Sequence, residues 1–204
     1  MKKLTVLILT ITMVLSVYGI VNATVLTFDD IATDTATAMP NGYGGFIWED
    51  TYVANSTWDQ ISATGYNNGT VSSDNVAGIR FGSISLVDGG TFDFDGAYLT
   101  SAWYDNNVVT IVGYQNGGIV GDPVMVTVDT DSPTWFDFSS SFNGIDALIL
   151  NTSNWHLAMD NFTFDSTGST DSGAAPCPEP ATMLLLGSGL AGLVGVSRKK
   201  LAKK

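Results

Sequence analysis

The sequence predicts an all-β protein: an antiparallel β-sandwich, of the jelly-roll kind, with an apolar helix expected at each end of the chain. Between the two ends, apolar residues recur with a period of two, as expected for strands with one face in a core. Clusters of Gly, Asn and Asp separate these segments, and such residues favour turns. No stretch asks for a long helix. These observations together favour a sandwich of short strands.

The first residues have the features of a secretory signal peptide. Lys2 and Lys3 form a basic start, an apolar run covers 4–21, and Val21-Asn22-Ala23 supplies the small residues that a signal peptidase reads. We therefore predict a signal peptide over 1–23, removed by signal peptidase after Ala23. The alternative, an uncleaved membrane anchor, also fits the length of the apolar run.

Residues 24–165 form the predicted sandwich, a length that suits one domain with its own core. Turn sequences such as Asp105-Asn106-Asn107 and Asn116-Gly117-Gly118 break the strand pattern. The expected strands, in chain order, cover 25–28, 46–52, 79–81, 91–95, 98–104, 108–114, 124–128, 135–138, 146–150 and 155–164.

Acidic side chains dominate the part of the chain between the two ends. Over 24–175, nineteen carboxylates face a single basic residue, Arg80, and all but Glu49 are Asp. A surface of one negative sign repels nucleic acid, so we expect no nucleic-acid partner. High ionic strength or bound cations could reduce the repulsion between these charges. Asp is common both in turns and among the ligands of hard cations.

A structural calcium ion is therefore one candidate cofactor. In a jelly roll the first and last strands commonly lie side by side, which would bring Asp29 and Asp30 close to Asp160 and Asn161. Ca²⁺ takes about six to eight oxygen ligands, and these side chains could supply several. Alternatively, the carboxylates hydrogen-bond to the backbone at the ends of strands. No other cofactor is indicated.

Three tryptophans are candidates for stacking on sugars. Trp58, Trp103 and Trp155 each stand beside polar or turn residues, whereas Trp48 and Trp135 lie in runs with Phe and are expected in the core. A flat ring on a surface packs against the C–H face of a pyranose. Alternatively, all five fill the core, because the only cysteine, Cys177, lies outside the domain and no internal disulfide supports the fold.

Little in the sequence supports an enzyme. His156 is the only histidine and has no partner set for a triad or a zinc site, so we expect a structural role. Glu49 could pair with an Asp, as in glycoside hydrolysis, but the sequence gives no separation between carboxylates. We predict no catalytic residues, with a glycoside hydrolase or lyase as an alternative.

The last residues have the features of a targeting segment rather than of a folded domain. Small and polar residues over 166–176 predict a flexible stalk, and 177–204 hold Pro178-Glu179-Pro180, an apolar run over 183–196 and a basic end with Arg198, Lys199 and Lys200. The apolar run would cross a membrane, with the cations on the cytoplasmic side. At about 1.5 Å per residue it spans only about 20 Å, which favours a temporary stop over a permanent anchor.

This order of Pro178-Glu179-Pro180, Gly-rich apolar segment and basic end resembles the PEP-CTERM sorting signal of bacterial exosortase substrates. The resemblance implies export and a transient stay in the inner membrane of a Gram-negative bacterium. It also implies cleavage near Glu179 by an exosortase-like enzyme, and delivery to the cell surface or extracellular matrix.

Four short motifs of the domain resemble ectodomains that often carry such tails, which look like carbohydrate-binding jelly rolls. The resemblance supports the jelly-roll fold. Together with the sorting signal and the lack of catalytic motifs, it leads us to predict a non-enzymatic protein associated with exopolysaccharide or biofilm. The alternative is a carbohydrate-binding module with a defined sugar site. The motifs are Leu26-Thr27-Phe28-Asp29-Asp30, Gly42-Tyr43-Gly44-Gly45-Phe46, Gly96-Ala97-Tyr98-Leu99 and Ala158-Met159-Asp160-Asn161-Phe162.

Overall fold

The structure is a computed structural model that describes residues 23–166. The predicted signal peptide, the apolar helices at both ends, the sorting signal and nearly all of the predicted stalk lie outside the described residues. Among residues 23–166, no helix has the length and apolar character that a membrane crossing requires.

Strands make up most of the described chain, and they pair antiparallel throughout. Short helical turns lie at η1 (Tyr43–Gly45), η2 (Asp59–Ile61) and α2 (Gly65–Asn68). The strands are β1 (Thr24–Leu26), β2 (Ala36–Ala38), β3 (Phe46–Asn55), β4 (Asn75–Leu86), β5 (Phe92–Ser101), β6 (Asn107–Gln115), β7 (Gly118–Val128), β8 (Thr134–Ile145), β9 (Ala147–Thr152) and β10 (Leu157–Asp165).

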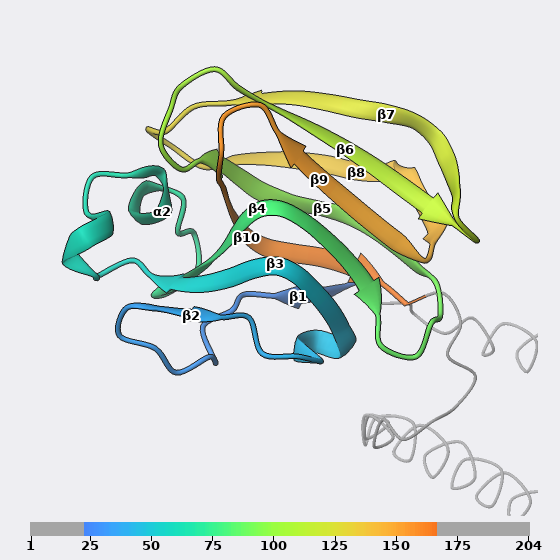
Figure 1. Ribbon diagram of the computed structural model, residues 1–204, viewed down its shortest axis with the longest axis horizontal. Helices are drawn as coiled ribbons and strands as arrows, with labels where there is room; N and C mark the ends of the chain where they lie inside the picture. Colours follow the sequence, from blue (N-terminus) through green and yellow to red (C-terminus); the bar gives the residue numbers. More distant parts are fainter. Residues whose placement is uncertain (1–22, 167–204) are drawn as a thin grey trace, which may run out of the picture. The chain divides into compact units, whose positions relative to one another are not determined.

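The strands form two facing layers joined through β4 (Figure 1). The hydrogen-bonded order is β7-β6-β9-β4-β10-β5-β8, with β3 on the other side of β4, β2 beside β3, and β1 beside β10. The first part of β4, 77–79, pairs with β10, and its later part, 81–85, pairs with β9. Arg80 therefore lies where β4 passes from one neighbour to the other. The predicted antiparallel sandwich is confirmed, while the finer jelly-roll topology stays a prediction.

The predicted neighbourhood of the first and last strands is present, because β1 pairs with β10 from Thr24 opposite Phe164. Several strand boundaries differ from expectation, and two of them have a local cause. Segments 91–95 and 98–104 belong largely to one continuous strand, β5, which runs through Gly96 and ends at Ser101. The last strand starts at Leu157 rather than at Trp155, because Trp155 has a φ of 65° and leaves the extended conformation.

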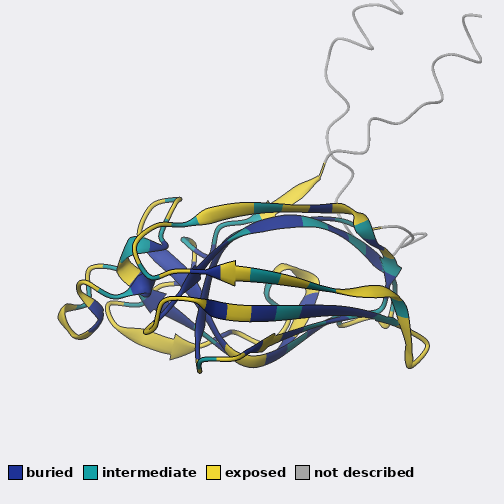
Figure 2. Ribbon diagram, turned by 90° about the horizontal axis from the view of Figure 1, so that it is seen from above, coloured by how far each residue is buried: buried dark blue, intermediate teal, exposed yellow. Residues whose placement is uncertain are grey.

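Aromatic rings fill the core between the layers. Phe46 lies 5.0 Å from Phe92 and 4.7 Å from Phe164 between ring centroids, and Phe94 stacks on Phe162 at 4.8 Å. Figure 2 shows the buried residues alternating with exposed ones along the strands. Each fully buried Phe contributes about 1.5–3 kcal/mol, so this core can hold the fold without disulfides.

The two tryptophans expected in the core have different places. Trp48 is buried, as predicted. The prediction is wrong for Trp135, which is 41% exposed, because the alternation along β8 turns Phe136 and Phe138 inward and Trp135 outward. The Trp135 ring instead covers Gly96 on β5, where a Cβ would lie 2.6 Å from the indole.

A smaller apolar cluster supports the end of the sandwich where α2 lies. It holds Tyr66 from α2, with Trp58 and Tyr52 packed against it. Gly65 brings α2 close to β5: its N–H donates to the Ala102 carbonyl at 3.0 Å, and a Cβ there would lie 1.7 Å from the Ser101 oxygen. Only glycine fits this position. The remaining members are Ala54, Ile61, Val76, Ala102 and Ala158.

Candidate functional site

The only histidine and the only basic residue of the sandwich meet where β4 changes its neighbour from β10 to β9, here called the fork of β4. The Arg80 Nε–H donates to His156 Nε2 at 3.1 Å, and the Tyr66 hydroxyl lies 2.8 Å from His156 Nδ1. Because a guanidinium can only donate, Nε2 must accept and Nδ1 must carry the imidazole proton, which it donates to Tyr66. Both ring nitrogens of His156 are therefore engaged.

Two further side chains complete this network. The Tyr52 hydroxyl contacts the Tyr66 hydroxyl and lies 3.1 Å from His156 Nδ1. The Trp103 Nε1 lies 3.3 Å from the same Nδ1, but that nitrogen carries a proton, so the indole N–H finds its acceptor in the Tyr66 hydroxyl. The hydrogen bond of its indole N–H to Tyr66 thus holds the Trp103 ring in place.

The network is neutral apart from Arg80. Burial lowers the pKa of His156, and the Arg80 charge lowers it further, against a weaker opposing effect of Asp50. Burial likewise raises the pKa of Tyr66 and of Tyr52. At pH 7 the imidazole is uncharged and both phenols are protonated.

A pinned turn between β9 and β10 presents Trp155. Its φ of 65° is unusual for a bulky residue, and the surrounding hydrogen bonds hold it there. Thr152 Oγ1 donates to the Trp155 carbonyl at 2.5 Å, and Asn154 N donates to Asn107 Oδ1 at 3.0 Å. The next carbonyl, of His156, accepts from Ala102 N at 3.1 Å. The Trp155 side chain is 68% exposed.

A second pinned loop, after β5, presents Trp103 and Tyr104. Ser101 Oγ donates to the Tyr104 carbonyl at 2.5 Å, and Asn106 N donates to Asp129 Oδ1 at 2.7 Å. Both aromatic side chains are exposed. Trp103 also packs edge to face on Tyr66, with ring centroids 5.6 Å apart.

Two depressions lie beside these loops and the fork of β4, and Trp155 lines both; together they are here called the aromatic groove. One half, of about 300 Å³, is lined by Trp103, Tyr104, Trp155 and His156. The other half, of about 460 Å³, is lined by Arg80, Phe81 and Trp155, so Trp155 belongs to both. The groove offers exposed ring faces for stacking and, beside them, polar groups that donate hydrogen bonds.

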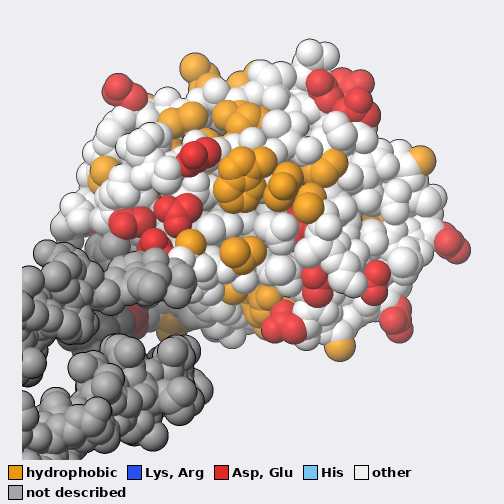
Figure 3. Space-filling model, turned by 180° about the vertical axis from the view of Figure 1, so that it is seen from behind, with side chains coloured by type: hydrophobic (Ala, Val, Ile, Leu, Met, Phe, Trp, Pro, Cys, Tyr) orange, Lys and Arg blue, Asp and Glu red, His pale blue; other side chains and the backbone are white. Residues whose placement is uncertain are grey.

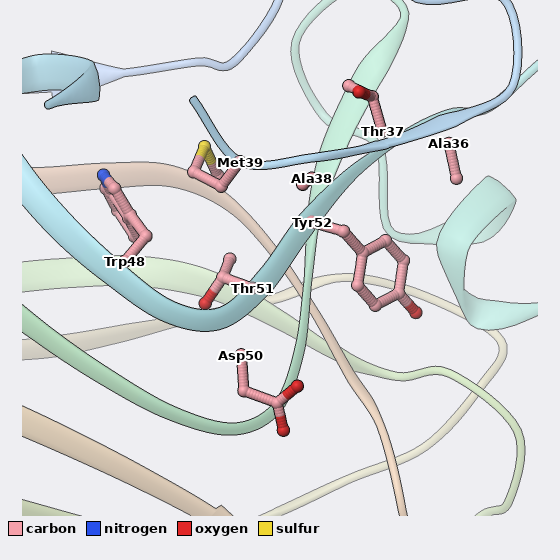
Figure 4. Close-up of a pocket in the computed structure, with 8 residues that line it drawn as sticks. All are labelled: Ala36, Thr37, Ala38, Met39, Trp48, Asp50, Thr51 and Tyr52. Atoms are coloured by element: carbon pink, nitrogen blue, oxygen red, sulfur yellow. The ribbon is translucent and has the colours of Figure 1, made fainter. Parts of the chain in front are cut away.

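A second hollow lies between β2 and β3 (Figure 4). It measures about 560 Å³, and Tyr52 links it to the histidine network. Half of its lining residues are Ala or Thr, and its one tryptophan, Trp48, is buried. It therefore lacks the exposed ring faces of the aromatic groove. The lining residues are Ala36, Thr37, Ala38, Met39, Trp48, Asp50, Thr51 and Tyr52.

Two of the three predicted sugar-stacking residues, Trp103 and Trp155, come together in the aromatic groove. The third, Trp58, lies apart, half-buried against the Tyr66 cluster. Sequence reasoning missed Tyr104, Arg80 and Phe81. Tyr104 carried a signal, since it follows Trp103 directly before the Asp105-Asn106-Asn107 turn, whereas nothing in the sequence shows that β4 passes under Trp155.

The three aspartates expected around calcium are not grouped as metal ligands. In the described range, no three His, Cys, Asp or Glu side chains are arranged to hold a metal ion. The acceptor oxygens serve the fold instead: Asp29 Oδ1 accepts from Asp74 N and Asn75 N, each at 3.0 Å. Asp30 Oδ1 accepts from the Tyr43 hydroxyl at 2.7 Å. These contacts give the aspartates roles in the fold, and the calcium site stays a prediction.

Asp160 is the most heavily used of these carboxylates. It is fully buried, and its Oδ2 accepts from Val71 N at 2.7 Å and from Ser72 N at 2.9 Å. Its Oδ1 accepts from Asn161 N at 2.7 Å. Burial raises its pKa, against the effect of these donors. Asn161 itself has a φ of 53° and lies in an irregularity between β10 and β5.

Glu49, the carboxylate considered for hydrolysis, is exposed on β3 opposite Ser83. It is not among the residues that line the aromatic groove. His156, the only histidine, is committed to Arg80 and Tyr66 through its two ring nitrogens.

Comparison with known proteins addresses the end of the chain. Residues 176–199 match the family model of the PEP-CTERM protein-sorting motif. The chain carries a PEP-CTERM sorting motif. The match includes Pro178, Glu179 and Pro180 and the basic residues Arg198 and Lys199. A PEP-CTERM motif indicates an exported protein that is anchored in the membrane, processed by an exosortase and brought to the cell surface.

Among solved structures, the sandwich is similar to a Clostridium thermocellum protein, the CBM22-1–GH10 modules of endo-1,4-β-D-xylanase 10B in complex with xylohexaose. The identity is 12% and the TM-score 0.33, over 69% of this chain and 30% of that chain. No curated protein matches the PEP-CTERM chain.

Proposed function

We propose that this exosortase-sorted surface protein associates with polysaccharide, without catalysis, through the aromatic groove of its sandwich. The observation that carries the proposal is the presentation of Trp155 and Trp103 on pinned loops around one depression. The sequence offered a general matrix component or a module with a defined sugar site. The groove favours the module with a defined sugar site, and the sorting motif supports its location at the cell surface.

The exposure of these rings needs an explanation in terms of energy. Burying a large apolar side chain contributes about 1.5–3 kcal/mol, which Trp155, at 68% exposure, largely gives up. The residue also keeps a strained backbone, a feature that gathers at ligand sites. Neighbouring exposed aromatics that form a patch are typical of a binding surface. A sugar ring would cover Trp155 and restore part of the lost burial.

The non-enzymatic part of the proposal rests on the state of the groove's polar groups. His156 is neutral and both of its ring nitrogens have partners, so it has no free position for proton transfer. No Asp or Glu is among the described residues that line the groove. Hydrolysis by paired carboxylates needs two such groups around the bond.

The test of sugar binding is affinity electrophoresis of the full-length protein, in detergent, through gels that contain soluble polysaccharides. We expect retardation by at least one polysaccharide and about tenfold weaker binding after Trp155→Ala, the loss of about 1.4 kcal/mol of stacking. Trp135→Ala is the matched control, since Trp135 is an exposed tryptophan outside the groove. Equal loss in both variants, or no retardation by any polysaccharide, would contradict the proposal.

The sorting step is tested in the native host by changing Pro178, Glu179 and Pro180 to Ala. We expect the wild type to yield a surface or matrix species that ends near Glu179 by intact mass, and the variant to remain unprocessed in the inner membrane. An unprocessed wild-type chain would make the tail a plain anchor.

Catalysis is tested on any polysaccharide that binds. We expect no new reducing ends and no unsaturated sugars over long incubation. Turnover that disappears in Glu49→Gln would instead identify a glycoside hydrolase or lyase.

A further inference from the structure

Arg80 has an unusual place for the only cation of an acidic domain. Its Nε–H is given to a neutral imidazole, His156 Nε2, rather than to a carboxylate. Within the described residues, the two terminal nitrogens of Arg80 have no hydrogen-bond or ion-pair partner. Its side chain is exposed and lines the half of the groove that Phe81 and Trp155 share. Arg80 therefore brings donors without a described partner to the edge of that space.

The groove differs in charge from the rest of the surface. Carboxylates are spread over the sandwich, and the face in Figure 3 shows many acidic side chains and no Lys, Arg or His. In contrast, none of the described residues lining either half of the groove is acidic. Asp50 is the carboxylate whose field reaches His156 and Tyr52, but it lies outside the groove lining. The lining of the groove thus carries one positive charge and no negative charge, on an otherwise acidic surface.

The contact with His156 orients this positive charge. A guanidinium held at Nε keeps its terminal nitrogens in a fixed plane, which suits the two oxygens of a carboxylate. The imidazole of His156 adds no second positive charge beside Arg80, because burial and the Arg80 charge keep it neutral at pH 7. Arg80 is therefore oriented by its protein contact and still has its paired donors available.

We infer that the aromatic groove selects an acidic saccharide, in which a sugar ring stacks on Trp155 and the carboxylate of a uronic acid binds the free donors of Arg80. The inference rests on the proposed function and names its ligand class. Trp155 belongs to both halves of the groove, so the site suits adjacent units of one chain. Repulsion from distant carboxylates is limited, because charges more than about 8 Å away are largely screened at physiological ionic strength.

Two matched pairs of polymers test this inference: polygalacturonate and polymannuronate, each beside its carboxyl-reduced form. The reduced polymers keep the linkage and lose only the charge. We expect the full-length protein in detergent to bind at least one uronate polymer about fivefold to tenfold more tightly than its reduced form. Arg80→Gln should remove this preference by weakening only the acidic polymer, and Trp155→Ala should weaken both forms.

Arg80→Lys keeps the charge without the paired donors, and we expect it to retain part of the preference. Circular dichroism and unfolding curves confirm that each variant is folded. Equal binding of acidic and reduced polymers, or equal loss on both in Arg80→Gln, would overturn the inference and leave the proposed function standing. So would binding of only neutral polysaccharides through Trp155. Failure of every polysaccharide to bind would remove the proposed function and the inference together.

Discussion

Asp160 shows how a single buried carboxylate organises its surroundings in this protein. It gathers two backbone N–H groups from the segment before β4, one from Asn161, and the hydroxyl of Ser72. A carboxylate can only accept, so its four lone-pair positions match these donors. Through these hydrogen bonds Asp160 holds the segment before β4 against β10.

Replacing Asp160 with Asn should therefore destabilise the fold. The amide would turn an N–H₂ toward groups that are themselves donors, and the charge-assisted bonds would be lost, at about 2–3 kcal/mol. Urea unfolding measures the change. Asp122→Asn makes the same chemical change at an exposed position on β7 and should alter stability by less than about 0.5 kcal/mol. Equal effects at the two positions would contradict this account.

The single histidine allows its protonation to be followed without assignment. Because burial and Arg80 lower the pKa of His156, we expect its imidazole ¹H NMR signal to titrate below about 6.5, the usual value. In Arg80→Gln the midpoint should move upward. The unfolded chain takes up the proton first, so stability should fall as pH drops from about 6.5 through the folded-state pKa. A midpoint at or above 6.5 in the wild type would be incompatible with the assigned network.

At the scale of the element, α2 depends on its close approach to β5. In Gly65→Ala the new Cβ would lie 1.7 Å from the Ser101 oxygen, so α2 must move and Tyr66 with it. We expect a loss of about 1–3 kcal/mol in thermal or urea unfolding. Gly118→Ala, where the nearest atom lies at 3.6 Å, serves as the control with little change. If Gly65→Ala is tolerated equally well, the contact does not position the helix.

Strands could be predicted where apolar and polar residues alternate along the sequence. Where contacts with neighbouring strands determine the structure, the prediction fails. Phe92 and Phe94 alternate with Asp and are recognisable as β5. Gly96 looks like a break in the sequence, but the Trp135 ring from β8 covers it and the strand continues. Strand β2, Ala36–Ala38, is short and exposed on all three residues, so it carries no periodic signal. Such features depend on tertiary partners.

The same limit applies to the site. Trp103 and Trp155 could be predicted as surface rings because turn residues flank them, and both lie in the groove. Arg80 and Phe81 could not, since their place follows from the exchange of partners by β4, a property of the whole sheet. The aspartates were ambiguous because metal binding and backbone clamping use the same residue type.

For the whole molecule, the dominant feature is the negative charge of the sandwich. Between residues 24 and 165 only Arg80 opposes a large excess of carboxylates, and self-repulsion of this kind destabilises a compact state. We expect the unfolding midpoint to rise as NaCl is increased from low to physiological concentration and beyond, because salt screens the repulsion. Near pH 4, where many carboxylates are protonated, the same salt series should have a smaller effect. A salt response independent of pH would point to another origin.

Strand β10 connects the proposed sugar-binding turn at Trp155 to the segment that leads to the sorting motif. It begins directly after Trp155 and His156 and ends at Asp165, just before the residues that lead to the sorting motif. Along its length it is bonded to β5 on one side and to β4 and β1 on the other. If a glycan binds Trp155 as proposed and is pulled by flow, the tension toward the tail enters β10 at one end and leaves it at the other. The covalent backbone of β10 carries that tension directly, so the hydrogen bonds to its neighbours are not the links that must hold.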